Sequence, residues 1–250
     1  MGAVFTPEDR ERIREILLAR AARDARISGA AITGSAALGR QDRWSDIDLA
    51  FGVDGQVDPV LTDWTAHMAE AHGSLHHVDV IAGEWTYRVF LLPGTLQVDL
   101  AFAPAAEFGS LAPGFRLVSG RARGERTMPG PAPAHLIGFG WLYAIHARTA
   151  IARGEAWQAE YMISGVRDHA MALACLRHGL PAMHGRGLDR LPNELRSSFE
   201  AALVRSLDTA ELSRAFESAV DRLSAAIRLA DPDLSVRLEP ELQTMTRTAR

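Results

Sequence analysis

Proline and glycine crowd into one stretch of the chain, Met128-Pro-Gly-Pro-Ala-Pro133, which directly follows the arginine-rich residues 121–126. Residues of these two types at this density cannot continue a helix or a central strand. We therefore predict a linker at 126–134, which separates a first domain at 1–125 from a second domain at 135–250. A length of 250 residues agrees with two domains, because a domain usually has about 100–200 residues.

Helix and strand patterns alternate before the linker. Thr6 and Asp9 form a candidate capping box for a helix at 7–25. Asp58 is a candidate cap for a helix at 59–71, and Pro93-Gly94 indicates a turn between two paired strands. Short apolar runs predict strands at 30–33, 48–53, 77–81, 87–92 and 96–102. This order predicts the α+β (α/β) fold class with a mixed β-sheet.

Only helical patterns follow the linker. Apolar residues at helical spacing predict helices at 135–153, 156–178, 192–206 and 209–230. Asp208 and Glu211 form a candidate capping pair for the last of these, and the residues from Pro232 onward are expected to be loosely attached. Short connections between the helices predict a C-terminal helical bundle.

The composition excludes several classes of protein. A net charge of −4 argues against a general nucleic-acid binder, which needs a basic surface. Cys175 is the only cysteine, so no intrachain disulfide can form. No apolar run approaches the roughly 18 residues of a membrane span, and Met1 to Arg20 lacks a signal-peptide core. All 27 basic side chains are arginine, which excludes lysine-dependent phosphate loops. We expect a cytoplasmic protein that binds neither nucleic acid nor membrane.

Three carboxylates carry the strongest indication of chemistry. Asp46 and Asp48 lie two residues apart at the start of a predicted strand, so their side chains share one face of it. Asp99 interrupts a second apolar strand, where a lone buried charge would be costly. A divalent cation between such carboxylates would relieve their repulsion, and a two-metal phosphoryl-transfer site requires this donor set.

A second group of residues has the properties of a phosphate site. Gly34 and Ser35 follow a predicted strand and precede a predicted helix at Ala36. Glycine allows close approach of the backbone, the serine hydroxyl can donate a hydrogen bond, and a helix N-terminus favours anions. Arg40 and Arg43 are close enough in sequence to neutralise further phosphate charge, although both are equally compatible with a solvated loop.

The order of these motifs resembles the pattern of the DNA polymerase β-like nucleotidyltransferase superfamily. In that pattern Gly-Ser is followed after about ten residues by Asp-x-Asp, and a further Asp lies on a later strand. The resemblance covers residues 28–102. The helical half, with Trp157, Glu160 and Arg167 on one predicted helix, looks like the C-terminal domain of aminoglycoside and lincosamide nucleotidyltransferases. The first likeness rests on a motif, and the second on architecture and a few residues.

The resemblance implies a role for each matching residue. Gly34 and Ser35 would bind the triphosphate, and Asp46 and Asp48 would each hold Mg²⁺. Asp99 would be the third acid, which binds the catalytic metal or takes the proton from the acceptor hydroxyl. The implied reaction is attack of a small-molecule hydroxyl on the α-phosphate of ATP or another nucleoside triphosphate, with transfer of AMP in the case of ATP and release of pyrophosphate. The implied site lies in a cleft between the two domains of a monomer or homodimer.

Other interpretations of these residues stay open. Glu160 is a candidate general base or clamp on a cationic acceptor, but Glu160 and Arg167 also have the spacing of a simple ion pair. Trp157 is expected to pack in the core or line a cleft. Trp44 is expected to pack in the core, with stacking on the nucleotide as the alternative. The acceptor could instead be a protein side chain, as in protein AMPylation, or an RNA end. A non-catalytic nucleotide-binding regulator or antitoxin-like protein is the remaining alternative.

Overall fold

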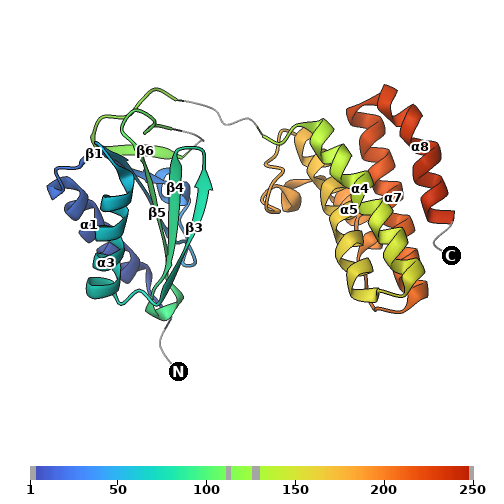
Figure 1. Ribbon diagram of the computed structural model, residues 1–250, viewed down its shortest axis with the longest axis horizontal. Helices are drawn as coiled ribbons and strands as arrows, with labels where there is room; N and C mark the ends of the chain where they lie inside the picture. Colours follow the sequence, from blue (N-terminus) through green and yellow to red (C-terminus); the bar gives the residue numbers. More distant parts are fainter. Residues whose placement is uncertain (1–3, 111–113, 126–129, 248–250) are drawn as a thin grey trace. The chain divides into compact units, whose positions relative to one another are not determined.

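Six strands form one mixed sheet in the first half of the chain (Figure 1). The computed structural model describes residues 4–110, 114–125 and 130–247, and the chain divides into two units, Met1–Met128 and Pro129–Arg250. The predicted linker at 126–134 includes residues 126–129, which lie outside the described residues. Its limits therefore stay a prediction.

The order of the strands in the sheet is β3-β4-β5-β2-β1-β6. β2 and β5 pair in parallel, whereas the other neighbouring strands pair in antiparallel fashion. The predicted turn at Pro93-Gly94 is confirmed as the short 3₁₀ helix η1 (Pro93–Thr95), which joins β4 to β5. The strands are β1 (Ile27–Thr33), β2 (Ile47–Val53), β3 (His76–Ala82), β4 (Trp85–Leu91), β5 (Gln97–Pro104) and β6 (Phe115–Gly120).

Helices α1 (Pro7–Arg23) and α3 (Val57–His72) cover one face of this sheet (Figure 1). The centre of the packing is a group of three aromatic rings, Phe51, Trp64 and Phe102, with centroids 4.7–5.7 Å apart. The capping box of Thr6 and Asp9 is confirmed. The predicted cap at Asp58 is wrong, because α3 begins at Val57, two residues before the predicted start, and places Asp58 inside its first turn.

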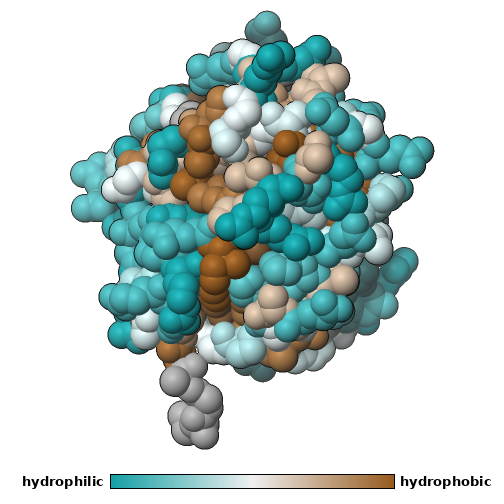
Figure 2. Space-filling model, turned by 90° about the vertical axis from the view of Figure 1, so that its left-hand side faces the viewer, coloured by the Kyte–Doolittle hydropathy of each residue, from teal (hydrophilic) through white to brown (hydrophobic). Residues whose placement is uncertain are grey.

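The outer surface over α1 and α3 is mostly hydrophilic, with a narrow strip of apolar residues. Figure 2 shows this side, which lies on the left in Figure 1. Both helices turn buried side chains toward the sheet, among them Leu17 of α1 and Met68 of α3. The hydrophobic effect thus accounts for the placement of both helices.

Small side chains line the opposite face of the sheet. Strand residues alternate between the two faces, so Ala50 of β2 and Ala101 of β5 point away from α1 and α3. They pack with Ala31, Trp85 and Phe108 in a second, smaller cluster. Asp48 and Asp99 lie two residues before Ala50 and Ala101, and so share this face with them.

The second unit contains only helices in its described residues 130–247. α7 packs against α4, α5 and α8 around a core rich in alanine, leucine and isoleucine. This unit, together with the mixed sheet that precedes it, confirms the predicted α+β fold class. The elements are α4 (Pro133–Arg153), α5 (Ala156–Arg177), η2 (Leu188–Arg190), α6 (Asn193–Ser198), η3 (Glu200–Ala202), α7 (Thr209–Ala230) and α8 (Pro232–Arg247).

Three local predictions in this unit are wrong. The helix expected at 192–206 is divided into α6 and η3. Asp208 is the N-cap residue of α7, but its side chain makes no capping hydrogen bond, because its carboxylate accepts from Ser206 Oγ. Glu211 accepts from the Arg205 backbone and the Arg214 guanidinium. The residues from Pro232 are not loosely attached, since they form α8 and bury Leu242. No helix among the described residues combines the length and apolar character needed to span a bilayer.

Candidate active site

The parallel pairing of β2 and β5 places two of the predicted carboxylates side by side. Asp48 is the direct register partner of Asp99, and neighbouring strands lie about 4.8 Å apart. Asp46 comes immediately before β2 and accepts a hydrogen bond from Gln97 Nε2, at the start of β5, over 3.2 Å. The structure therefore brings Asp46, Asp48 and Asp99 to the same end of the same two strands.

Asp99 is the carboxylate with the most unfavourable surroundings. Its Oδ1 atom is buried and has no hydrogen-bond partner among the described residues. Burial, together with the negative charge of Asp46, raises the pKa of Asp99 to about 6. A buried oxygen without a donor is costly for the folded protein, and a bound cation or proton would remove that cost.

Gly34 lies directly against the carboxylate of Asp48. The turn after β1 gives Gly34 a φ of +62°, a conformation that favours glycine. A Cβ atom at this position would clash with Asp48 Oδ2 and lie 2.7 Å from its Cγ. The backbone of Gly34 and the carboxylate of Asp48 therefore form one continuous surface that no other residue type could provide.

Ser35 opens the helical turn beyond Gly34. Its Oγ atom is buried and has no hydrogen-bond partner among the described residues, so the hydroxyl is available to a ligand. The predicted helix is only the four-residue α2 (Gly34–Ala37). A helix of one turn has a small dipole, so the local contribution to anion binding comes from the Gly34 backbone and the Ser35 hydroxyl.

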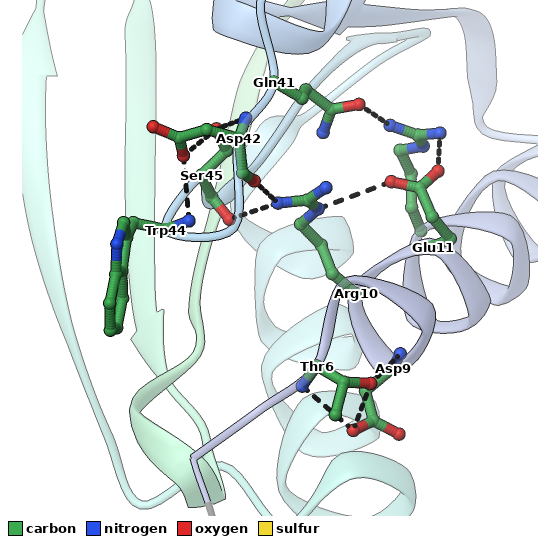
Figure 3. Close-up of polar contacts among 9 residues, drawn as sticks. Thr6, Asp9, Arg10, Glu11, Gln41, Asp42, Trp44 and Ser45 are labelled. Atoms are coloured by element: carbon green, nitrogen blue, oxygen red, sulfur yellow. Dashed lines mark hydrogen bonds and ion pairs between the residues drawn. The ribbon is translucent and has the colours of Figure 1, made fainter.

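Arg10 of α1 fixes the loop that leads into Asp46 (Figure 3). It is only 4% exposed, and its Nη1 atom donates to the carbonyls of Asp42 at 2.6 Å and Ser45 at 3.0 Å. The Asp42 carboxylate closes the same loop by accepting from the Trp44 backbone and the Ser45 hydroxyl. The sequence does not single out Arg10, because an arginine on an amphipathic helix is usually solvated.

Arg40 and Arg43 lie on the exposed part of this loop. The Arg43 guanidinium stacks on the Trp44 ring at 4.7 Å, and Trp44 is 68% exposed. The prediction that Trp44 packs in the core is therefore wrong. The structure presents these two arginines and Trp44 to solvent, where an arriving anion could reach them.

Tyr87 is a further residue of the site that the sequence did not reveal. It pairs with Ala101 across β4 and β5, and so lies on the same face as Asp99. Burial and the charge of Asp99 raise the pKa of its hydroxyl, which keeps it a hydrogen-bond donor. Only the register between β4 and β5, which depends on tertiary pairing, reveals this proximity.

The donor set suits a hard divalent cation in its chemistry. Carboxylate and hydroxyl oxygens are the ligands that Mg²⁺ prefers, and the partnerless Asp99 Oδ1 is an unused donor atom. As placed, however, no three histidine, cysteine, aspartate or glutamate side chains within 4–110, 114–125 and 130–247 form a group that could hold a metal ion. The three aspartates share one end of two strands without a closed ligand shell.

Glu160 belongs to the second unit, on α5. Its carboxylate accepts a hydrogen bond from Ser164 Oγ at 2.8 Å. Arg167 pairs with its neighbour Asp168 at 2.8 Å, so the structure contains no Glu160–Arg167 pair among its described ion pairs. Trp157, one turn before Glu160, is 77% exposed, which excludes the core packing predicted for it.

Comparison with known proteins finds similarity to solved structures. The structure is similar to that of an aminoglycoside 6-adenyltransferase from Bacillus subtilis, with 14% sequence identity and a TM-score of 0.40. The match covers 92% of this chain and 96% of the other. No protein family model matches the chain, and no curated protein matches it in sequence. The description of the site therefore stands on its geometry.

Proposed function

We propose that the protein is a nucleotidyltransferase that transfers AMP from ATP to a hydroxyl of a small molecule and releases pyrophosphate. The observation that carries this proposal is the contact between Gly34 and Asp48 beside Asp99. It combines a backbone open to close approach, two adjacent carboxylates and a buried oxygen without a partner. A purely structural turn has no need for this combination, which is costly to the folded state.

The triphosphate would lie over the turn that follows β1. Gly34 lets phosphate oxygens approach the backbone, and the Ser35 hydroxyl donates a hydrogen bond to one of them. Arg40 and Arg43 are proposed to neutralise the outer phosphates from the exposed loop, while Arg10 holds that loop in place. These contacts bring the α-phosphate toward the carboxylates, and positioning supplies much of the rate enhancement in phosphoryl transfer.

Asp46, Asp48 and Asp99 are proposed as the residues that hold Mg²⁺. When bound, the metal would neutralise charge on the triphosphate and on the departing pyrophosphate. The close approach of Gly34 would keep the Asp48 carboxylate in one orientation. The hydrogen bond from the Gln97 amide would do the same for the Asp46 carboxylate. Tyr87 closes the site on the side of β4 and can donate a hydrogen bond.

The reaction joins the acceptor oxygen to the α-phosphorus and breaks the bond between that phosphorus and the oxygen that bridges to the β-phosphate. The electron pair of the broken bond leaves with pyrophosphate, and the hydroxyl proton passes to a carboxylate. We assign the proton to Asp99, because its Oδ1 atom has no partner among the described residues. Glu160 is the alternative base, and its hydrogen bond from Ser164 would keep its carboxylate oriented.

The proposal is tested by pyrophosphate release from ATP and Mg²⁺ across a panel of aminoglycosides and lincosamides. Asp48→Asn is expected to lower kcat/KM by about 10³-fold or more, a change of ~4 kcal/mol in transition-state stabilisation. Asp54→Asn, at an exposed position just after β2, is the matched control and is expected to leave kcat/KM unchanged.

Two further variants separate the remaining roles. If Glu160→Gln keeps turnover, Glu160 is not the base and the proton passes to Asp99. If Glu160→Gln abolishes turnover and Asp99→Asn keeps it, the proton passes to Glu160. Equal turnover in the wild type and Asp48→Asn would refute the proposed site. If ATP binds but no small molecule is modified, the acceptor is tested next as a protein side chain, with labelled AMP as the readout.

A further inference from the structure

One pocket is lined entirely by residues of the helical unit. It has a volume of about 630 Å³ and opens between the start of α4, the second half of α5 and the loop at 182–188. Sites for small molecules usually have volumes of about 300–1,000 Å³ and a mostly apolar lining with a few polar groups. Leu136, Ala172 and Leu188 provide apolar walls here. His135 and His169 provide imidazoles from α4 and α5, and His184 provides a third from the loop.

Aromatic contacts hold the imidazoles of His135 and His169 in place. Phe139 of α4 lies between them, with its centroid 4.5 Å from that of His135 and 6.1 Å from that of His169. Tyr143 supports His169 from one turn further along α4, at 5.2 Å. The pocket therefore presents flat, oriented ring faces, against which another ring can stack.

The hydrogen bond of His169 determines the chemistry of its second nitrogen. Nδ1 lies 2.8 Å from the carbonyl oxygen of Gly165, one turn earlier on α5. A carbonyl oxygen can only accept, so Nδ1 must carry the hydrogen. In the neutral ring this leaves Nε2 without a hydrogen, and Nε2 is then an acceptor that a ligand hydroxyl can satisfy.

The charge of the pocket argues against a polycationic ligand. Its only acidic lining residue among those described is Asp168, and Asp168 Oδ1 already accepts from Nε and Nη2 of Arg167 at 2.9 and 2.8 Å. The described histidines and acids of the pocket also form no group that could hold a metal ion. An uncharged ligand with an apolar ring fits this lining better than an ion.

We propose that this pocket binds a small, uncharged ring compound that carries a hydroxyl group. The ring lies among the imidazole faces and the apolar walls, and the hydroxyl donates its hydrogen to His169 Nε2. This is a proposal about binding alone, and it holds whether or not the first unit transfers a nucleotide.

Methyl NMR of the full-length protein tests this proposal with two probes, 4-methylphenol and toluene. Met183 lines the pocket, and its methyl signal can be assigned among the seven methionines with Met183→Leu. Titrations are made at pH 8. Both probes are expected to shift the Met183 signal, and 4-methylphenol is expected to bind at least fivefold more tightly than toluene.

His169→Phe separates the hydroxyl contact from ring stacking, because phenylalanine keeps a ring and lacks Nε2. We expect this variant to bind the two probes with affinities within twofold of each other. His146→Phe, at an exposed position of α4 outside the pocket, is the matched control and should keep the fivefold preference. The titrations of the wild type can overturn the proposal by themselves. If neither probe shifts the Met183 methyl signal, the pocket does not bind ring compounds. If 4-methylphenol and toluene bind with equal affinity, the hydroxyl contact is excluded. A preference that persists in a folded His169→Phe variant would also exclude His169 as the acceptor.

Discussion

The two units differ in how completely they satisfy their buried polar groups. Within the part of the chain that the structure describes, every buried side-chain nitrogen or oxygen without a hydrogen-bond partner belongs to the first unit. The residues concerned are Arg20, Ser28, Ser35, Gln41, His67, His72 and Asp99. The described core of the second unit is apolar apart from the buried Ser235, which has no unpartnered buried oxygen. The first unit therefore keeps buried polar atoms without hydrogen-bond partners, two of them at the candidate active site, Ser35 Oγ and Asp99 Oδ1. The second unit is instead stabilised by close apolar packing.

The largest effect on stability is expected in the core of the helical unit. Phe216 of α7 is fully buried, so Phe216→Ala removes a large apolar side chain and leaves a cavity. The expected cost is ~4 kcal/mol in the free energy of unfolding, measured by urea denaturation followed at 222 nm. Leu229→Ala, on the same helix at 58% exposure, should cost little. Equal costs would contradict the contrast between core and surface in this unit.

Arg10 tests a satisfied polar network in the first unit. Arg10→Met keeps an apolar stem but removes the donor of two carbonyls, so the expected loss of stability is ~3 kcal/mol. Because the loop before Asp46 is released, ATP turnover should fall as well. Arg12→Met, at a 67% exposed side chain of the same helix, provides the control and should change neither quantity. Normal turnover in Arg10→Met would show that the loop needs no support from α1.

Asp24 tests a satisfied charge in the same unit through its pH dependence. Hydrogen bonds from Arg26 and Trp64 lower the pKa of Asp24 to about 2. A lowered pKa stabilises the fold above the ordinary pKa of the unfolded chain, and this contribution disappears as the pH falls toward 2. Asp24→Asn should therefore cost ~2 kcal/mol at pH 7 and progressively less below pH 4, by urea denaturation.

The control for Asp24→Asn is Asp63→Asn, because Asp63 also pairs with Arg26 but its side chain is 55% exposed. That variant should change stability little at any pH. If Asp24→Asn lowers the free energy of unfolding by the same amount at pH 7 and pH 3, the charge of Asp24 contributes nothing to stability.

The smallest effect is expected at the candidate active site, and it has the opposite sign. Asp99→Asn removes a negative charge beside Asp46 and Asp48 while keeping the shape of the side chain. In buffer without metal or nucleotide, the variant is expected to be ~1 kcal/mol more stable than the wild type. If Asp99→Asn instead clearly lowers the free energy of unfolding, the Asp99 carboxylate stabilises the fold. The unpartnered polar atoms of the first unit would then be no indication of a ligand site.

Much of the fold could be predicted from local patterns. The capping box of Thr6 and Asp9 marked the start of α1, and the turn at Pro93 marked the hairpin, because both signals depend on neighbouring residues alone. α8 was missed because Pro232 and Pro240 interrupt its pattern. Proline is tolerated in the first turn, and the burial of Leu242 against the other helices supports the rest.

The candidate site was predictable only in part. Asp46, Asp48 and Asp99 stood out because acids at strand positions are costly without a partner. Their arrangement depends on the parallel pairing of β2 with β5, which brings together segments far apart in the sequence. Arg10 and Tyr87 were missed for the same reason, since only tertiary contacts distinguish them from ordinary helix and strand residues.

Calorimetric titration with Mg²⁺ and a non-hydrolysable ATP analogue tests the central claim most directly, namely that the end of β2 and β5 is a nucleotide site. The wild type and Asp54→Asn should bind one equivalent with equal affinity. Asp48→Asn should bind at least tenfold more weakly, and Gly34→Ala should lose binding because its Cβ would displace the Asp48 carboxylate. Equal affinity in all four proteins, or no binding to the wild type, would contradict the account.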